Sequence, residues 1–413
     1  MVVSENAILW QETELYQDKL LPFYTTSTKI SGAALDVRKK MLFVVENDGC
    51  VYQSSLDIEN ATDKREIICQ KNSSLISKPQ LLSVDWLNSQ LYIMGEMLNT
   101  DHKTWTISRC DFEGKKLVVA VGGLTGMPVH IEVDPYNGYL FWVIPNDDID
   151  SGLYRLDLSE ISNEIKHESK PFQMIKGKHL GAFIVDHTRF RLLVPMQNEN
   201  TIMSVSLNGK NEEDIRKNTQ SPLLHTVNSL AMANNLFIWT NGKEIMTEEY
   251  HTQYHTYYHN SWIPKDINSP LVALCVNSSS SQPIPVPVNP PHNCQALLGP
   301  TKARVSWLIP QLVGDQGKGA FKVSYELFLN FRKLFNLFYQ FPAIRIGIIS
   351  SKSSVKTEPK SILTTSQKLH LSFPILFQTR STPSKLLRTH RVVPGNGHKN
   401  LLPRLSKLLT NDS

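Results

Sequence analysis

The chain has 413 residues, of which 41% are apolar and 20% charged, and its net charge is +5. These proportions are ordinary for a globular protein, and the length allows about two or three domains. No long uncharged apolar run occurs, so the sequence predicts no membrane span, and the N-terminus "MVVSENAILWQETELYQ" lacks the features of a signal peptide.

A repeated unit runs through residues 25–250, and a half-copy, Ile8-Leu9-Trp10, precedes it. The first four copies have an Asp, a polar turn, an apolar pair six residues later such as Leu42-Phe43, and an alternating segment such as "CVYQSSL". The period is roughly 46 to 52 residues, the length of a propeller blade. The fifth copy has Met232 in place of the Asp. The repeat positions that we single out are Asp36, Asp85, Asp134, Asp186, Trp142 and Trp239.

Short apolar runs and Asn-Gly or Asp-Gly turns indicate hairpins rather than helices. We therefore expect an all-β chain whose residues 1–276 form a six-bladed β-propeller. The aspartates recur once per blade, whereas an active site is a single place, so we interpret them as structural. The first blade starts at its second strand, and a missing strand would expose a sheet edge. We predict that "SPLVALCV" (269–276) fills that gap and closes the ring.

Residues 277–291, "NSSSSQPIPVPVNPP", have the composition of a stiff Ser/Pro linker. Residues 292–330 contain two candidate strands and Trp307, which is typical of the start of a β-sandwich. Residues 331–413 show no alternation, and we expect a divergent, poorly ordered tail. A membrane-surface helix around residues 325–349 is the less favoured alternative.

The tail is basic, with about fourteen Lys and Arg against two acidic residues. It interleaves few aromatic residues with these charges and has no known binding motif. We therefore predict no nucleic-acid partner.

The pattern of Asp, Leu-aromatic pair and "LFWV" or "IWTN" resembles the YWTD propellers of lipoprotein receptors. Followed by a Pro-rich linker and "CQALLGPTKARVSW", it is similar to the extracellular region of the Ros/Sevenless receptor tyrosine kinases. The resemblance covers residues 1 to about 330 and implies a location outside the cell, with a protein ligand or co-receptor bound on a propeller face. The 292–330 segment then resembles the start of a fibronectin type III domain. No kinase motif occurs in this chain, so we predict no enzyme activity.

Five cysteines form no CxxC or zinc pattern. If the chain is extracellular, one or two disulfides are expected, and Cys50 with Cys69 is the first pair to test because a short loop separates them. Sequons for N-glycosylation are present at Asn60, Asn72, Asn277 and Asn411.

Two segments have metal-ligand character. His251, His255 and His259 are spaced four apart, and "NDDID" (146–150) groups three carboxylates. A histidine-rich connector and a solvated loop are the favoured interpretations, so we predict no metal and no cofactor.

The main functional hypothesis is an interaction fragment of a Ros/Sevenless-type receptor without its membrane and kinase segments. The alternative is a soluble propeller hydrolase, similar to a lactonase, with calcium in its channel. That enzyme needs a ring of Asp, Asn and Glu facing the channel at one depth.

Overall fold

The structure is a computed structural model. It describes residues 1–10, 20–57, 64–71, 73, 75–97, 103–145, 150–161, 170–177, 179–197, 201–215, 226–233, 236–249, 259–265, 267–284, 292–298, 302–308, 345–346, 368–374 and 377–378. These residues fall into two compact units, one up to Ile284 and one from His292.

The first unit is a six-bladed propeller, and in the described residues each blade is a four-stranded antiparallel sheet. Blade 1 is the sheet of β24 (Leu271–Leu274), β1 (Val2–Ser4), β2 (Ala7–Trp10) and β3 (Leu21–Thr25). Blade 2 consists of β4 (Ile30–Asp36), β5 (Met41–Glu46), β6 (Cys50–Ser55) and β7 (Arg65–Cys69). Blade 3 consists of β8 (Ile76–Asp85), β9 (Gln90–Met97), β10 (Trp105–Asp111) and β11 (Val118–Leu124).

Blade 4 consists of β12 (His130–Asp134), β13 (Tyr139–Ile144), β14 (Gly152–Asp157) and β15 (Phe172–Lys176). Blade 5 consists of β16 (Ile184–Asp186), β17 (Arg191–Met196), β18 (Thr201–Ser206) and β19 (Glu213–Asp214). Blade 6 consists of β20 (Ser229–Ala233), β21 (Leu236–Thr240), β22 (Ile245–Glu249) and β23 (His259–Trp262). The first strand named in each blade is the inner strand, which packs against the inner strands of both neighbouring blades.

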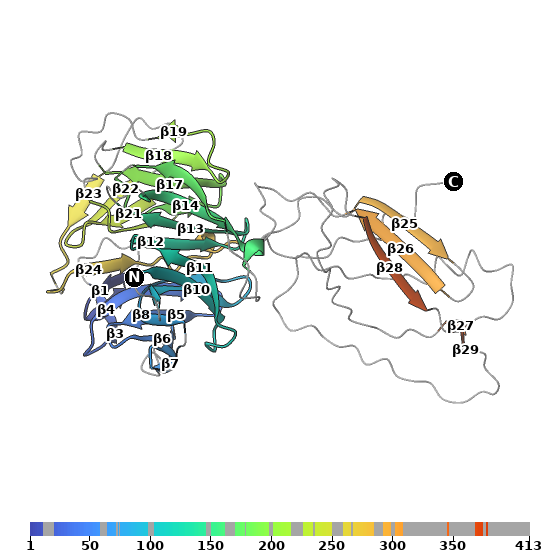
Figure 1. The fold of residues 1–413 in the computed structure, drawn as a ribbon, viewed down its shortest axis with the longest axis horizontal. Coiled ribbons are helices and arrows are strands. Elements are labelled where there is room, and N and C mark those ends of the chain that lie inside the picture. The colour runs from blue at the N-terminus through green and yellow to red at the C-terminus, as the bar shows by residue number, and fades with distance from the viewer. Residues whose placement is uncertain are drawn as a thin grey trace. The chain divides into compact units, whose positions relative to one another are not determined.

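The ring closes in blade 1, where strands from the two ends of the propeller sequence pair. Strand β24 lies beside β1 (Figure 1), with Val2 opposite Leu274 and Val3 opposite Ala273. The same strand contacts β20 of blade 6 and β4 of blade 2. The predicted closing strand is therefore confirmed.

Strand β13 explains the apolar run of the best-preserved repeat. All six of its residues are buried, because the blade is covered on both sides. Phe141 and Val143 pack with residues of blade 5, whereas Leu140, Trp142 and Ile144 pack with residues of blade 3. Strand alternation thus divides one apolar run between two interfaces. Trp142 and Trp239 are both fully buried in interfaces of this kind.

Inner strands have one unpaired edge along the channel, and side chains of neighbouring blades bond part of it. Ser83 Oγ accepts a hydrogen bond from the Val133 N–H at 3.0 Å, and Ser229 Oγ accepts one from the Leu274 N–H at 3.0 Å. These bonds supply partners to backbone groups that the blade's own ladder leaves free.

The sixth blade differs from the sequence alignment. Pairing places Ala233 opposite Leu236, the place that Asp134 holds opposite Tyr139 in blade 4. Ala233, not Met232, therefore occupies the Asp position. The turn of blade 6 has two residues between the paired positions, where the turn of blade 4 has four, and this shorter turn explains the misalignment.

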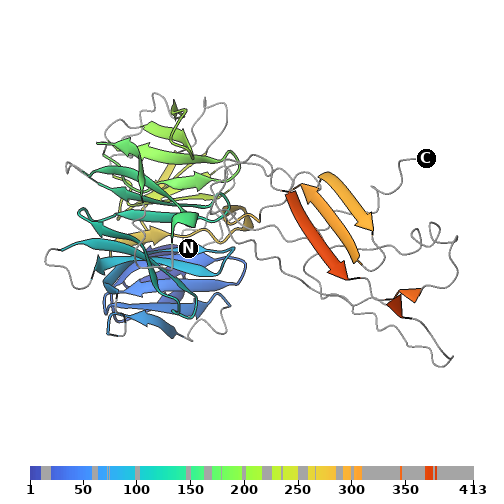
Figure 2. The same cartoon turned by 45° about the vertical axis from the view of Figure 1, so that its right-hand side comes forward.

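The second unit contains β25 (His292–Leu298) and β26 (Lys302–Leu308), which form an antiparallel hairpin. Strand β28 (Lys368–Pro374) pairs with β26, as Figure 2 shows, and β27 (Arg345–Ile346) pairs with β29 (Phe377–Gln378). The hairpin coincides with the two strands predicted after the linker, while the fibronectin assignment stays a prediction. Most of the predicted tail lies outside the described residues.

The closure can be tested by truncation. A chain ending at residue 265 lacks β24 and should lose at least about 3 kcal/mol of unfolding free energy, because apolar contacts and ladder bonds disappear together. A chain ending at residue 291 keeps the whole propeller unit and is the matched control. Urea unfolding followed by tryptophan fluorescence measures both, and equal midpoints for the two chains would refute the closing role.

Candidate functional site: the turn face of the ring

Four aspartates end the inner strands of blades 2 to 5 at the same end of the ring, which we call the turn face. Asp36, Asp85, Asp134 and Asp186 are completely buried. Each carboxylate accepts hydrogen bonds from the backbone N–H groups of its own turn, as Asp134 does from Asn137 at 3.1 Å. A carboxylate used this way fixes the turn between the first two strands.

The turns share a second feature. The fourth residue after each aspartate has a positive φ angle, namely 53° at Lys40, 57° at Ser89, 82° at Gly138 and 55° at Phe190. Glycine adopts this region without a steric penalty, whereas other L-residues do not. The buried carboxylates therefore hold three non-glycine residues in an unfavourable conformation.

Burial is the main influence on the pKa of Asp134 and of Asp85, and it raises both. At Asp134, the electrostatic interaction with the nearby His187 and the hydrogen bonds from Asn137 oppose this rise in pKa. At Asp85, hydrogen bonds from Asn88 and Leu87 oppose it. His187 Nδ1 lies 3.7 Å from Asp134 Oδ1, and its side chain is 8% exposed.

The residues that follow the aspartates gather aromatic rings on the turn face. The rings of Trp86 and His187 meet edge to face, with their centroids 5.5 Å apart. The centroid of the Tyr136 ring lies 6.2 Å from that of His187 and 5.6 Å from that of Phe190. Trp86 is only 7% exposed. This aromatic cluster joins blades 3, 4 and 5.

Residues 277–284, which we call the strap, lie against this face. The Gln282 side chain donates to Leu35 O at 2.6 Å and accepts from the Val37 N–H at 2.8 Å, and the Trp86 Nε1–H donates to Pro283 O at 3.1 Å. The predicted linker thus begins with a segment bonded to blades 2 and 3. Its remainder, 285–291, lies outside the described residues.

Glu132 is a carboxylate within the inner strand β12, two residues before the turn aspartate Asp134. Its Oε1 accepts from the Val185 N–H at 3.4 Å, and its Oε2 lies 3.9 Å from His130 Nε2. His130 in turn meets the Phe183 ring edge to face at 4.8 Å. In the described inner strands, this single carboxylate joins two blades and does not form part of an acidic ring.

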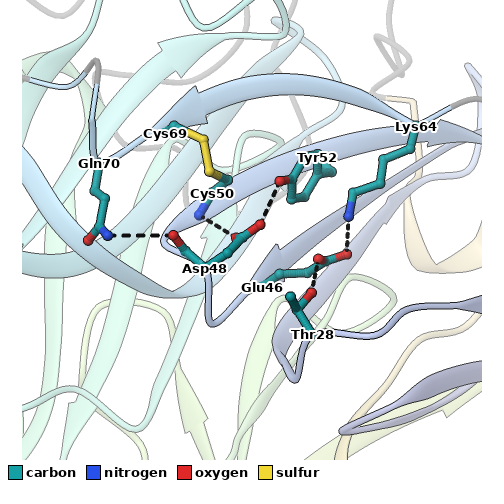
Figure 3. The surroundings of a disulfide bond; sticks show 8 residues. All are labelled: Thr28, Glu46, Asp48, Cys50, Tyr52, Lys64, Cys69 and Gln70. Carbon is teal, nitrogen blue, oxygen red and sulfur yellow. Dashed lines mark hydrogen bonds and ion pairs between the residues drawn. A yellow bond between two sulfur atoms is a disulfide. The ribbon is translucent and has the colours of Figure 1, made fainter.

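The opposite end of blade 2 carries a disulfide (Figure 3). Cys50 and Cys69 are directly paired across β6 and β7, with their Cα atoms 4.1 Å apart, and the structure joins their sulfur atoms. Asp48 accepts from the Cys50 N–H at 2.9 Å and from the Tyr52 hydroxyl at 2.6 Å. The disulfide therefore joins β7 to the start of β6, next to the β5–β6 turn that Asp48 holds.

Glu46, beside the disulfide, is a buried carboxylate at the contact of blades 1 and 2. It accepts hydrogen bonds from Tyr24 at 2.5 Å, from Lys64 at 2.7 Å and from Thr28. Burial alone would raise the pKa of Glu46, but these bonds and the Lys64 charge outweigh it and hold the pKa below its usual value. Burial and the bond to Glu46 raise the pKa of Tyr24.

The remaining candidate residues are only partly described. Asn277 is exposed at the start of the strap, whereas Asn60, Asn72 and Asn411 lie outside the described residues, as do His251 and His255. His259 lies in β23, and of the acidic loop only Asp150 is described; its Oδ2 accepts from Thr125 Oγ1 at 2.6 Å.

One group of potential metal ligands lies close together within the described part of the chain, namely Cys50, Glu66 and Cys69. The disulfide uses both of its sulfur atoms, so this group offers no thiolate. No helix among the described residues is long and apolar enough to cross a membrane.

Sequence reasoning did not identify Trp86, His187 or Gln282. A signal was present for the first two, since each directly follows a repeat aspartate. Gln282 had no signal, because its partners lie more than 240 residues away in the sequence.

The fold defines the first unit as a six-bladed β-propeller, as predicted. A chain of the crystal structure of a nidogen/laminin complex has the same fold, with a TM-score of 0.53 and 12% identity over 67% of this chain and 97% of that chain. No protein-family model matches the sequence.

The predicted resemblance to the Ros/Sevenless receptor kinases is confirmed. The chain is 25% identical to Protein sevenless of Drosophila virilis over 75% of its own length and 11% of the relative's. It is 25% identical to the proto-oncogene tyrosine-protein kinase ROS of Homo sapiens over 68% of its own length and 11% of the relative's. The chain thus spans about a tenth of the length of these relatives.

The role of the buried aspartates can be tested at Asp134. Asp134→Ala leaves the Asn137 backbone N–H and side-chain amide without their buried acceptor, and should lower the unfolding free energy by about 2–4 kcal/mol. Asp150→Ala removes an exposed carboxylate and should cost less than about 0.5 kcal/mol. Urea unfolding at pH 7 compares the two, and equal effects would show that the buried turn is not special.

The Glu46 network predicts a pH-dependent contribution to stability. Because the folded-state pKa is lowered, the contribution is complete above the ordinary value of 4.5 and is lost as the pH falls through the folded-state pKa. Glu46→Gln should cost about 1–3 kcal/mol at pH 7 and progressively less in acid. The exposed Glu66→Gln is the control. A cost of Glu46→Gln that does not change between pH 7 and acid would contradict this assignment.

Proposed function

We propose that this chain is an extracellular interaction module of the Ros/Sevenless receptor type, which binds a protein ligand or co-receptor on a face of the propeller. The observation that carries the proposal is the similarity to Sevenless and ROS over 75% and 68% of a chain whose first unit is a closed ring. The ROS relative is named as a kinase, whereas the first unit of this chain is a propeller. The role is therefore recognition.

Two features of blade 2 and the strap support a location outside the cell. Disulfides persist in oxidising compartments, and the paired positions of Cys50 and Cys69 suit one. The exposed sequon at Asn277 is accessible for the N-glycosylation that secreted chains receive.

The turn face also bears on where a partner can bind. Its centre already contacts the strap through Gln282 and Pro283, and Asn277 lies at the start of that segment. We therefore place the protein partner on the opposite face, where the connector from blade 3 to blade 4 exposes Met127 and Val129. Exposed apolar side chains are the usual anchors of protein interfaces.

The calcium-enzyme alternative has no supporting observation among the described residues. Each of the four repeat aspartates bonds its own turn, and Glu132 bonds blade 5, so each of these carboxylates already has a structural partner within the ring.

The location is tested by producing the full chain behind an added signal peptide in cultured animal cells. We expect secretion, glycan at Asn277 and a Cys50–Cys69 cross-link in peptide mapping, with the buried Cys110 unlinked as the internal control. Cys50→Ser with Cys69→Ser should lower the unfolding free energy by about 3 kcal/mol, the typical effect of closing a loop of this size. Retention in the cell with both cysteines reduced would contradict the proposal.

Partner binding is tested separately, by adding the labelled secreted chain to cells that present the protein ligand or co-receptor at their surface. Saturable binding that the unlabelled chain competes away, and that Met127→Asp reduces, supports the proposed face. Saturable binding unaffected by Met127→Asp but lost on mutation of the turn face would move the partner to that face.

A further inference from the structure

Two basic turns from neighbouring blades lie on the turn face. The first follows Asp36 and carries Arg38, Lys39 and Lys40; the second follows β10 and carries Lys115 and Lys116. All five side chains are exposed. We call these residues the basic turn pair.

The structure brings the two turns together. Lys39 Nζ lies 4.6 Å from the centre of the Phe112 ring, which precedes the second turn, and bonds Ser89 Oγ. In the second turn, a Cβ at Gly114 would lie 2.3 Å from the oxygen of Ile67 in blade 2, so the turn packs directly on that blade. Blades 2 and 3 therefore share one basic surface.

The second turn is also rigid. Asp111 Oδ1 accepts from the Lys115 N–H at 2.7 Å, the Asp111 N–H bonds the Lys115 carbonyl at 3.0 Å, and the Gly114 N–H bonds the Asp111 carbonyl at 2.9 Å. The backbone thus presents Lys115 and Lys116 in a fixed arrangement. Prearranged charges lose less entropy on binding.

Most of this charge is not neutralised within the described residues. Lys40 forms an exposed ion pair with Asp57 at 3.2 Å, while no ion pair of Arg38, Lys115 or Lys116 occurs there. An exposed ion pair such as Lys40–Asp57 contributes little free energy. Glu113 is the one acidic residue of the second turn, and the neighbouring strap has no charged residue.

We propose that the basic turn pair binds a sulfated polysaccharide at the cell surface. Clustered Lys and Arg attract polyanions. The exposed large apolar side chains of the described chain are Leu21, Met127, Val129, Phe172, Ile263 and Ile284, none of them in the two turns. A protein partner would lack an apolar anchor there, whereas a chain of sulfate groups needs none. The choice of a polysaccharide rests on the proposed extracellular location.

The test measures binding of the secreted full chain to immobilised heparan sulfate by surface plasmon resonance. The test variant combines Arg38→Ser, Lys39→Ser, Lys115→Ser and Lys116→Ser. The matched control combines Lys176→Ser, Lys210→Ser, Lys243→Ser and Lys265→Ser, which removes the same charge from exposed positions elsewhere. Both variants keep the basic tail, so its contribution cancels.

We expect about a tenfold loss of affinity in the test variant and less than about a threefold loss in the control, with weaker binding as salt rises. Circular dichroism and urea unfolding confirm that both variants fold. Equal losses in the two variants would overturn the site. Equal binding of the wild type to polyglutamate would overturn the polysaccharide as its ligand, whereas weak binding to unsulfated hyaluronan would support it.

The experiments distinguish a failure of the polysaccharide site from a failure of the proposed function. If cells retain the chain, the same binding measurement on protein purified from the cell lysate still tests the site: heparan sulfate binding that depends on the basic turn pair would then contradict the location while supporting the site. Secretion and saturable partner binding without the affinity difference would contradict the site alone.

Discussion

Each blade of this propeller has an inner strand whose far edge faces the channel, so no blade is complete by itself. The pairing of β24 with β1 is the interaction on which the ring depends, since it supplies the inner strand of blade 1 from the other end of the sequence. Without it, blades 6 and 2 would each lose a neighbour that covers their apolar side chains. Ring closure therefore makes six marginal sheets into one cooperative unit.

Within the closed ring, the turn aspartates and the apolar runs have separate tasks. Strands such as β13 bury both of their faces, so their sequence is apolar without interruption. Buried carboxylates then determine where those strands begin, because Asp134 and its counterparts bond the backbone of the connecting turn. The turn face results from this division, and its aromatic cluster and the first basic turn occupy positions that the repeat aspartates fix.

The blade period, the short alternating strands and the polar turns together made the ring and its closing strand predictable from the sequence. Pairing register was harder: Met232 was aligned with the aspartates because the two-residue shortening of the blade 6 turn leaves no trace in composition. Contacts between residues distant in sequence, such as Gln282 with Leu35, cannot be read from local patterns. The aromatic cluster required the ring geometry, which brings the residues after three different aspartates to one place.

The strap has a mechanical consequence. Tension applied to the chain beyond Ile284 would reach the ring first through the bonds of Gln282 and Pro283, before it could load β24. The contacts of Gln282 and Pro283 would therefore break before the force reached β24, and they protect the closing strand. Such an arrangement suits a module tethered at its C-terminal end, where a force that opened the ring would destroy every blade interface at once.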